Sequence, residues 1–158
     1  MKGLAIVFFV TLSSVVVGVP AAYIVLDQSG MLGEQMNDEM IELSVFEGNN
    51  HSTGDPYVIN EILINGNVLD INLSYSGGCA THAFDLFAPN SFLESSPPQT
   101  TLYLYHESND DYCEAWITEV VSFDLQPLAD LFADMYKSHH GDVLCNLHGT
   151  AFSLHYSF

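Results

Sequence analysis

The chain has 158 residues, a length that suits one domain with an appendage. Its 20 Asp and Glu residues face only two Lys and Arg, so the formal net charge is −18. Binding of nucleic acids or of anionic lipid head groups through a basic patch is excluded, because such binding depends on Lys and Arg side chains. A cationic partner, such as a metal ion or a basic protein of the cell envelope, fits this charge.

The N-terminal segment is strongly apolar. Lys2 is followed by an uncharged run from Gly3 to Leu26, and the next charged residue is Asp27. A membrane-spanning helix needs roughly 20 such residues, whereas the core of a signal peptide needs only roughly 7–15. The length therefore favours a retained anchor, although the small residues around Ala21 also suit cleavage by a signal peptidase. Either form exports the acidic remainder, which would lie in the periplasm or outside the cell, tethered to the membrane if the helix is retained.

Three segments follow from this division: a signal anchor or signal peptide (1–26), a linker (27–40) and an extracytoplasmic β-rich domain (41–158). The clearest element of the domain is a β-hairpin. Residues 57–64 lead into Asn65-Gly66-Asn67, and apolar and polar residues then alternate from Leu69 to Tyr75. Asn-Gly supplies the positive φ angles of a tight hairpin turn.

Further strands are predicted where apolar residues alternate or run together between turn signals. They are Ile41–Val45, Ala83–Ala88, Leu102–Tyr105, Cys113–Leu125, Val143–Leu147 and Phe152–Phe158.

One helix is predicted near the C-terminus. Apolar residues recur at a spacing of three to four between Pro127 and Tyr136, with Pro127 at the first turn and Gly141 just past the end. Strands and helices do not alternate along the chain, which argues against a doubly wound parallel sheet. The prediction is a mainly β domain, an antiparallel β-sandwich or small barrel with one short helix.

Two segments carry the residues with chemical potential. Cys79 and His82 follow a pair of glycines after the hairpin, and His106 and Cys113 flank a polar segment further on. Cysteines that meet in an oxidising compartment generally pair, so a Cys79–Cys113 disulfide is the favoured interpretation. The acidic residues between His106 and Cys113 are interpreted as a polar turn. Cys145 lies within an apolar strand and is interpreted as a small buried hydrophobe.

Two alternatives use the same residues. Cys79, His82, His106 and Cys113 could form a site for zinc or copper, because both metals accept thiolate and imidazole ligands. Cys79 beside His82 could instead be the nucleophile of a cysteine-dependent enzyme, but acidic surroundings raise the pKa of a thiol. The sequence contains none of the usual short catalytic motifs, so neither a catalytic residue nor a cofactor is assigned.

The stretch Tyr75–Phe84, Y-S-G-G-C-A-T-H-A-F, resembles a group of poorly characterised bacterial exported proteins and lipoproteins. They share a Y-S-G-G-C-x-x-H-x-F motif, a later H-x-S-N-x-D-x-C loop and a closing F-D-L-x-P-L segment; the last two correspond here to 106–113 and 123–128. The resemblance implies a secreted domain similar to the C-terminal β-sandwich of NigD-like proteins, with no established activity. Unlike the lipoproteins, this chain has no cysteine close after its apolar N-terminus. The expected function is structural or binding, without catalysis.

Overall fold

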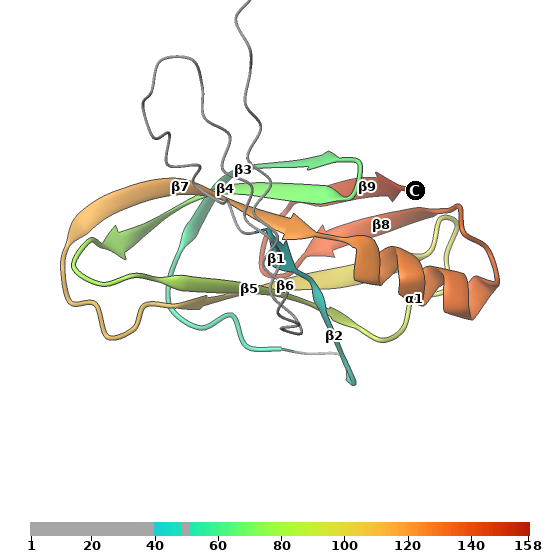
Figure 1. Cartoon of the computed structure of the whole chain (residues 1–158), viewed down its shortest axis with the longest axis horizontal. Coiled ribbons are helices and arrows are strands. Elements are labelled where there is room, and N and C mark those ends of the chain that lie inside the picture. Colours follow the sequence, from blue (N-terminus) through green and yellow to red (C-terminus); the bar gives the residue numbers. More distant parts are fainter. Residues whose placement is uncertain (1–39, 49–50) are drawn as a thin grey trace, which may run out of the picture. The chain divides into compact units, whose positions relative to one another are not determined.

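The computed structural model describes residues 40–48 and 51–158, which form two β-sheets and one helix (Figure 1). The elements, in order, are β1 (Ile41–Glu42), β2 (Ser44–Phe46), β3 (Val58–Asn65), β4 (Val68–Gly77), β5 (Ala83–Pro89), β6 (Gln99–Glu107), β7 (Ala115–Asp124), α1 (Gln126–Tyr136), β8 (Asp142–Leu147) and β9 (Ser153–Ser157). The prediction of a mainly β domain with one short helix near the C-terminus is confirmed. The predicted anchor and nearly all of the predicted linker lie outside the described residues.

The strands form a four-stranded sheet, β1-β7-β4-β3, and a five-stranded sheet, β2-β5-β6-β8-β9. The predicted hairpin is β3 and β4, with Asn65 paired to Val68 and Gly66 at a φ of 59° in the turn. A tight hairpin turn demands such positive φ angles, which glycine adopts without steric cost. Strand β4 pairs along its whole length with β7, which makes these two the central strands of their sheet.

The prediction of a wholly antiparallel arrangement is wrong. Strand pairs β1–β7, β2–β5 and β6–β8 are parallel. Parallel neighbours require a long connection between them, and the chain from β6 to β8 runs through β7 and α1 before it returns. Alternating apolar residues show which face of a strand is buried, but they do not show the direction of its neighbour.

The single strand predicted around Leu43 is divided between the two sheets. Strand β1 pairs with β7, whereas β2, which begins one residue after Leu43, pairs with β5. Leu43 lies between them, is only 2% exposed, and its amide donates to the carbonyl of Asp124 at 3.0 Å. The chain therefore crosses from one sheet to the other at this leucine.

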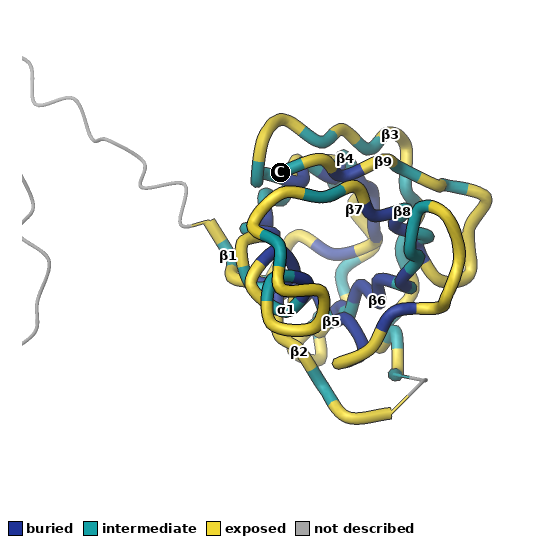
Figure 2. Tube along the Cα trace, turned by 90° about the vertical axis from the view of Figure 1, so that its right-hand side faces the viewer, coloured by how far each residue is buried: buried dark blue, intermediate teal, exposed yellow. Residues whose placement is uncertain are grey.

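The core lies between the sheets, where the inward residues of β4 meet those of β5 and β6. These residues are almost completely buried: Leu69, Ile71, Leu73, Leu86, Leu102 and Leu104. Figure 2 shows the buried segments of the trace inside the domain and the exposed ones on its outer turns. Complete burial of each such side chain stabilises the fold by about 1.5–3 kcal/mol relative to exposure. Cys145 is 1% exposed and belongs to this core, as predicted.

Helix α1 follows the C-terminal end of β7 and buries Leu128 and Phe132. It ends at Tyr136, with Lys137 in the left-handed region at a φ of 56°, so Lys137 and not Gly141 terminates it. Gly141 instead leaves space for the Phe132 ring, because a Cβ there would lie 2.6 Å from that ring.

Two loops cross between the sheets at the end of the domain opposite α1. Loop 78–82 connects β4 to β5, and loop 108–114 connects β6 to β7. The pairing of Gly77 with Ala115 and of Ala83 with Glu107 brings the two loops to the same place. All four site residues named from the sequence lie in these loops or next to them.

Candidate functional site

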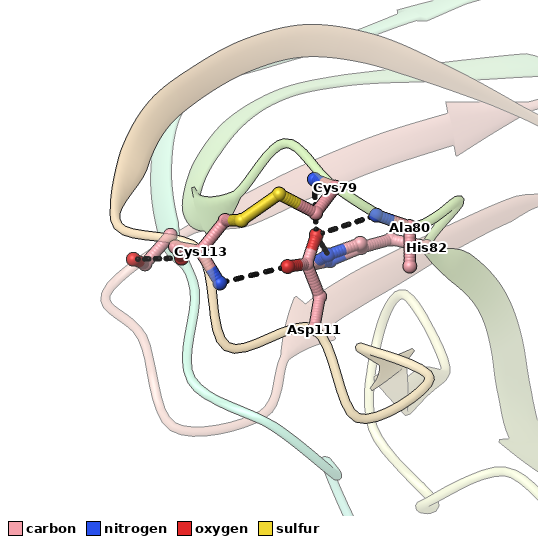
Figure 3. The surroundings of a disulfide bond; sticks show 6 residues. Cys79, Ala80, His82, Asp111 and Cys113 are labelled. Carbon is pink, nitrogen blue, oxygen red and sulfur yellow. Dashed lines mark hydrogen bonds and ion pairs between the residues drawn. A yellow bond between two sulfur atoms is a disulfide. The ribbon is translucent and has the colours of Figure 1, made fainter.

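A disulfide joins the two crossing loops. Cys79 of loop 78–82 is bonded to Cys113 of loop 108–114, with the Cα atoms 5.8 Å apart (Figure 3). This is the pairing favoured from the sequence. The bonded sulfurs are not thiolates, so in this oxidation state they lack the form that binds zinc or attacks a substrate.

The Asp111 carboxylate makes a second connection between the same loops. Its Oδ2 accepts hydrogen bonds from the amides of Cys79 and Ala80, each at 2.8 Å, and its Oδ1 accepts one from the Cys113 amide at 2.8 Å (Figure 3). The side chain is 0% exposed. The amide hydrogen bonds from Ala80, Cys113 and Cys79, with a smaller contribution from His82, hold the pKa of Asp111 well below its usual range. The carboxylate is therefore ionised at neutral pH and fixes both loops.

His82 and His106 extend this network into the sandwich. His82 Nε2 lies 3.3 Å from Asp111 Oδ2, and His82 Nδ1 lies 2.7 Å from His106 Nε2. His106 Nδ1, in turn, lies 3.3 Å from the carbonyl oxygen of Asp55. The three side chains and the carbonyl form one continuous series of hydrogen bonds.

The acceptors at the two ends of this series assign its protons. The carbonyl of Asp55 only accepts, so His106 carries its proton on Nδ1 and its Nε2 is an acceptor. His82 Nδ1 then donates to His106 Nε2, and the other ring nitrogen of His82 faces the Asp111 carboxylate. The neutral His106 thus accepts a hydrogen bond from His82 and donates one to the carbonyl of Asp55.

Burial keeps His106 in this neutral form. Its residue is 1% exposed, and its ring stacks on Phe84 with centroids 4.6 Å apart and planes 6° from parallel. Burial lowers the pKa of His106, and the neighbouring His82 charge lowers it further, although hydrogen bonding to the Asp55 carbonyl acts in the opposite direction. The Tyr75 ring stacks on His82, with the two ring centroids 4.3 Å apart.

Gly77 makes room for the His82 ring. A Cβ at Gly77 would lie 2.6 Å from His82 Nε2, closer than side-chain atoms approach one another. A glycine pair at this point of the sequence is expected either to end the strand or to form a bulge in it, and Gly77 is the last residue of β4. The space that Gly77 leaves for a residue five positions later has no signature in the sequence.

A pocket of about 400 Å³, here called the end pocket, opens beside the disulfide. It is lined by residues 55–58, 74–76 and 111–114 together with His106, Ser108 and Trp116. Tyr112 and Trp116 are 88% and 65% exposed, which is unusual for large aromatic side chains. The disulfide and Asp111 hold the loop that forms one wall of the pocket.

Sequence reasoning located the neighbourhood of this site but not its organisation. The cysteines pair with each other, and the two histidines meet each other rather than the sulfurs. Among the described residues, the possible metal-ligand atoms that lie within 4.8 Å of one another are those of Cys79, Asp111 and Cys113. This group contains the two cysteines predicted as ligands for zinc or copper, but it has Asp111 in place of the two histidines. Asp111 was interpreted as part of a polar turn, and Trp116 as part of a strand. Trp116 carried no signal of its own in the sequence, because its pairing with Ser76 and its outward position are seen only in the structure.

Fold and site together define a disulfide-linked β-sandwich, and such bonds persist in oxidising compartments outside the cytoplasm. Within residues 40–48 and 51–158 no helix has the length and apolarity needed to cross a membrane. No family model and no curated protein matches the chain.

Three solved structures are similar to this chain. A NigD-like immunity protein from Bacteroides caccae has a TM-score of 0.49 and 15% identity over 73% of this chain and 58% of its own. A putative toxin-related protein from Parabacteroides distasonis has a TM-score of 0.44 and 21% identity, over 75% of this chain and 60% of its own. A protein of unknown function from Bacteroides vulgatus has a TM-score of 0.45 and 16% identity, over 75% and 56%. The chain thus spans less than two thirds of the length of each.

Proposed function

We propose that the protein is a non-catalytic binding module of the cell envelope, exported by its N-terminal segment and tethered by it to the membrane. The end pocket is its binding surface. The observation that carries this proposal is the exposure of Trp116 and Tyr112 at a pocket whose wall is fixed by a disulfide. Rigid aromatic side chains in a preformed pocket are typical of binding sites, because little conformational entropy is lost when a ligand is bound.

The chemistry of the neighbouring polar groups supports binding over catalysis. Asp111 uses both oxygens to hold loop amides, and His82 uses both ring nitrogens within the hydrogen-bond series. The sulfurs of Cys79 and Cys113 are bonded to each other. A general base or nucleophile needs a free lone pair directed at the substrate, whereas these groups are engaged in maintaining the shape of the loops.

The binding role is tested with the full chain in a neutral detergent, using Trp116, the only tryptophan of the chain, as a fluorescent probe. A basic peptide, an acidic peptide and a neutral oligosaccharide serve as probes. We expect one class to change the emission saturably, and the exchange Tyr112→Ser to weaken that response without altering the circular dichroism spectrum. If no class changes the emission, the end pocket is not a binding surface.

The tether is tested separately by fractionation of cells. We expect the full chain to remain with the membranes after an alkaline wash, and a chain lacking residues 2–26 to stay inside the cell in soluble form. Recovery of a shortened chain free in the periplasm or medium would show that the segment is a cleaved signal peptide. That outcome removes the tether and leaves export unchanged.

A second candidate, a redox-controlled zinc or copper module, is favoured by the proximity of Cys79, Asp111 and Cys113 within 4.8 Å. Reduction would release two thiolates beside a carboxylate, a set of donors that zinc accepts. Thiol counting with metal analysis distinguishes the two functions. One free thiol, that of Cys145, without metal supports the binding module, whereas three free thiols with stoichiometric zinc or copper support the metal module.

A further inference from the structure

The end pocket carries negative charge. Asp55 and Glu114 are among its lining residues, and neither Lys nor Arg is. Asp111 also lines the pocket, but its carboxylate is 0% exposed and is enclosed by the loops. The only Lys or Arg of the described residues, Lys137, follows α1, which is attached to the opposite end of β7 from Trp116. No fixed cation of residues 40–48 and 51–158 therefore faces these carboxylates from within the lining.

The carboxylates of Asp55 and Glu114 differ in how firmly they are held. Asp55 Oδ2 accepts a hydrogen bond from the Ser108 amide at 2.8 Å, and hydrogen bonding from Ser108 lowers the pKa of this carboxyl group. Asp55 is therefore ionised and fixed in direction. Glu114 is exposed and follows directly after the disulfide cysteine Cys113, so its carboxylate lies at the rim.

Part of the remaining wall is aromatic, beside polar residues such as Ser74 and Ser76. Trp116 and Tyr112 are exposed at the pocket, and Tyr57 donates its hydroxyl proton to the carbonyl of Leu104 at 3.0 Å, which leaves its ring as a fixed surface. Aromatic faces attract organic cations, tryptophan most strongly, and the attraction increases when carboxylates are close to the same cation. A small metal ion would instead require several oxygen ligands in its first shell.

We propose that the end pocket takes an arginine side chain presented by a basic segment of another protein. This proposal rests on the proposed binding function and names its ligand class. The planar guanidinium group stacks on aromatic rings and forms paired hydrogen bonds with a carboxylate, so it matches both kinds of wall. A pocket of about 400 Å³ accommodates such a side chain with its flanking backbone.

The charge of the whole chain indicates a protein partner of a different sequence. A net charge of −18 attracts a multiply basic segment over a longer range than it attracts a single small cation. A second copy of this chain cannot supply the segment, because it contains only two Lys and Arg residues, both lysine.

The test uses two peptides of identical length, acetyl-Gly-Arg-Gly-Arg-Gly-amide and its citrulline counterpart, in which an uncharged urea replaces each guanidinium. The full chain in neutral detergent is titrated at low salt while the Trp116 emission is followed. We expect saturable binding of the arginine peptide, at least tenfold weaker binding of the citrulline peptide, and a loss of affinity as salt is raised.

Two charge variants connect the effect to the pocket. Glu114→Gln should weaken binding of the arginine peptide several-fold. Glu94→Gln removes the same charge from an exposed residue of the loop between β5 and β6, outside the pocket lining, and should leave binding unchanged. Equal weakening by both variants would show that only the net charge matters and would overturn the proposal.

The remaining outcomes separate the ligand class from the function. Equal binding of the two peptides, or a response to a neutral oligosaccharide alone, overturns the arginine proposal and leaves the binding module intact. Spermine binding as tightly as the arginine peptide overturns the protein partner in favour of a small polyamine. The absence of any response to these four probes and to the acidic peptide overturns both the arginine proposal and the proposed function.

Discussion

Removal of the Cys79–Cys113 disulfide should lower the free energy of unfolding by about 4 kcal/mol at 25 °C. The two cysteines are 34 positions apart in sequence. In the loop-entropy model, a closed loop of that length lowers the entropy of the unfolded chain by about 13 cal/mol/K, which gives this figure. The variant Cys79→Ala/Cys113→Ala removes the bond and leaves the buried Cys145 in place.

The folded structure should survive the change, because Asp111 still accepts hydrogen bonds from the amides of residues 79, 80 and 113. Urea unfolding followed by circular dichroism measures the loss, and the variant should show a larger m value because its unfolded state is less compact. Wild-type protein in reductant is the matched control and should lose the same amount. A loss below about 1 kcal/mol in both would refute the entropic reasoning.

The remaining predictions concern groups near the disulfide and in the core. Gly77→Ala should destabilise the fold by more than about 1 kcal/mol, because the added Cβ would clash with His82. Gly66→Ala is the control: its Cβ would meet nothing within 4 Å, so it should cost about 1 kcal/mol for the positive φ alone. Urea unfolding midpoints compare the two variants, and equal costs would contradict the predicted clash. The free energy of unfolding should decrease as the pH is lowered below about 6.5, because the unfolded chain takes up a proton that buried His106, with its lowered pKa, does not. This part of the pH dependence should disappear in His106→Gln, and an unchanged pH dependence would exclude His106 as its source. Burial raises the pKa of Cys145 to about 12. A thiol reagent should therefore label no cysteine in the folded protein and one cysteine in urea, and rapid labelling of the folded protein would contradict this prediction.

The elements that could be predicted from the sequence are those with a local physical cause. Asn65-Gly66 determines its hairpin because the turn itself requires the positive φ. Helix α1 is visible from the spacing of Leu128 and Phe132 on one face. The pairing of Cys79 with Cys113 was predicted from the expected oxidising compartment and from two cysteines at the ends of predicted strands.

The features that could not be predicted depend on partners distant in the sequence. Asp111 is bound by amides 31 and 32 positions away, and an amide can be donated by nearly any residue, so no pattern identifies the acceptor. The parallel strand pairs could not be predicted for a similar reason, because a strand's own residues do not encode the direction of its neighbour. Trp116 fits the apolar content of a strand, and only the pairing of β7 with β4 places it at a pocket.

The crossing at Leu43 also bears on aggregation. An unpaired strand edge invites pairing with another molecule, and β1 and β2 cover the outer edges of β7 and β5, one in each sheet. A single stretch of six residues, 41–46, therefore protects both sheets, and Leu43 anchors it in the core between them. Loss of this stretch, by proteolysis or by truncation, would expose the edges of β7 and β5 at once and make the domain prone to self-association.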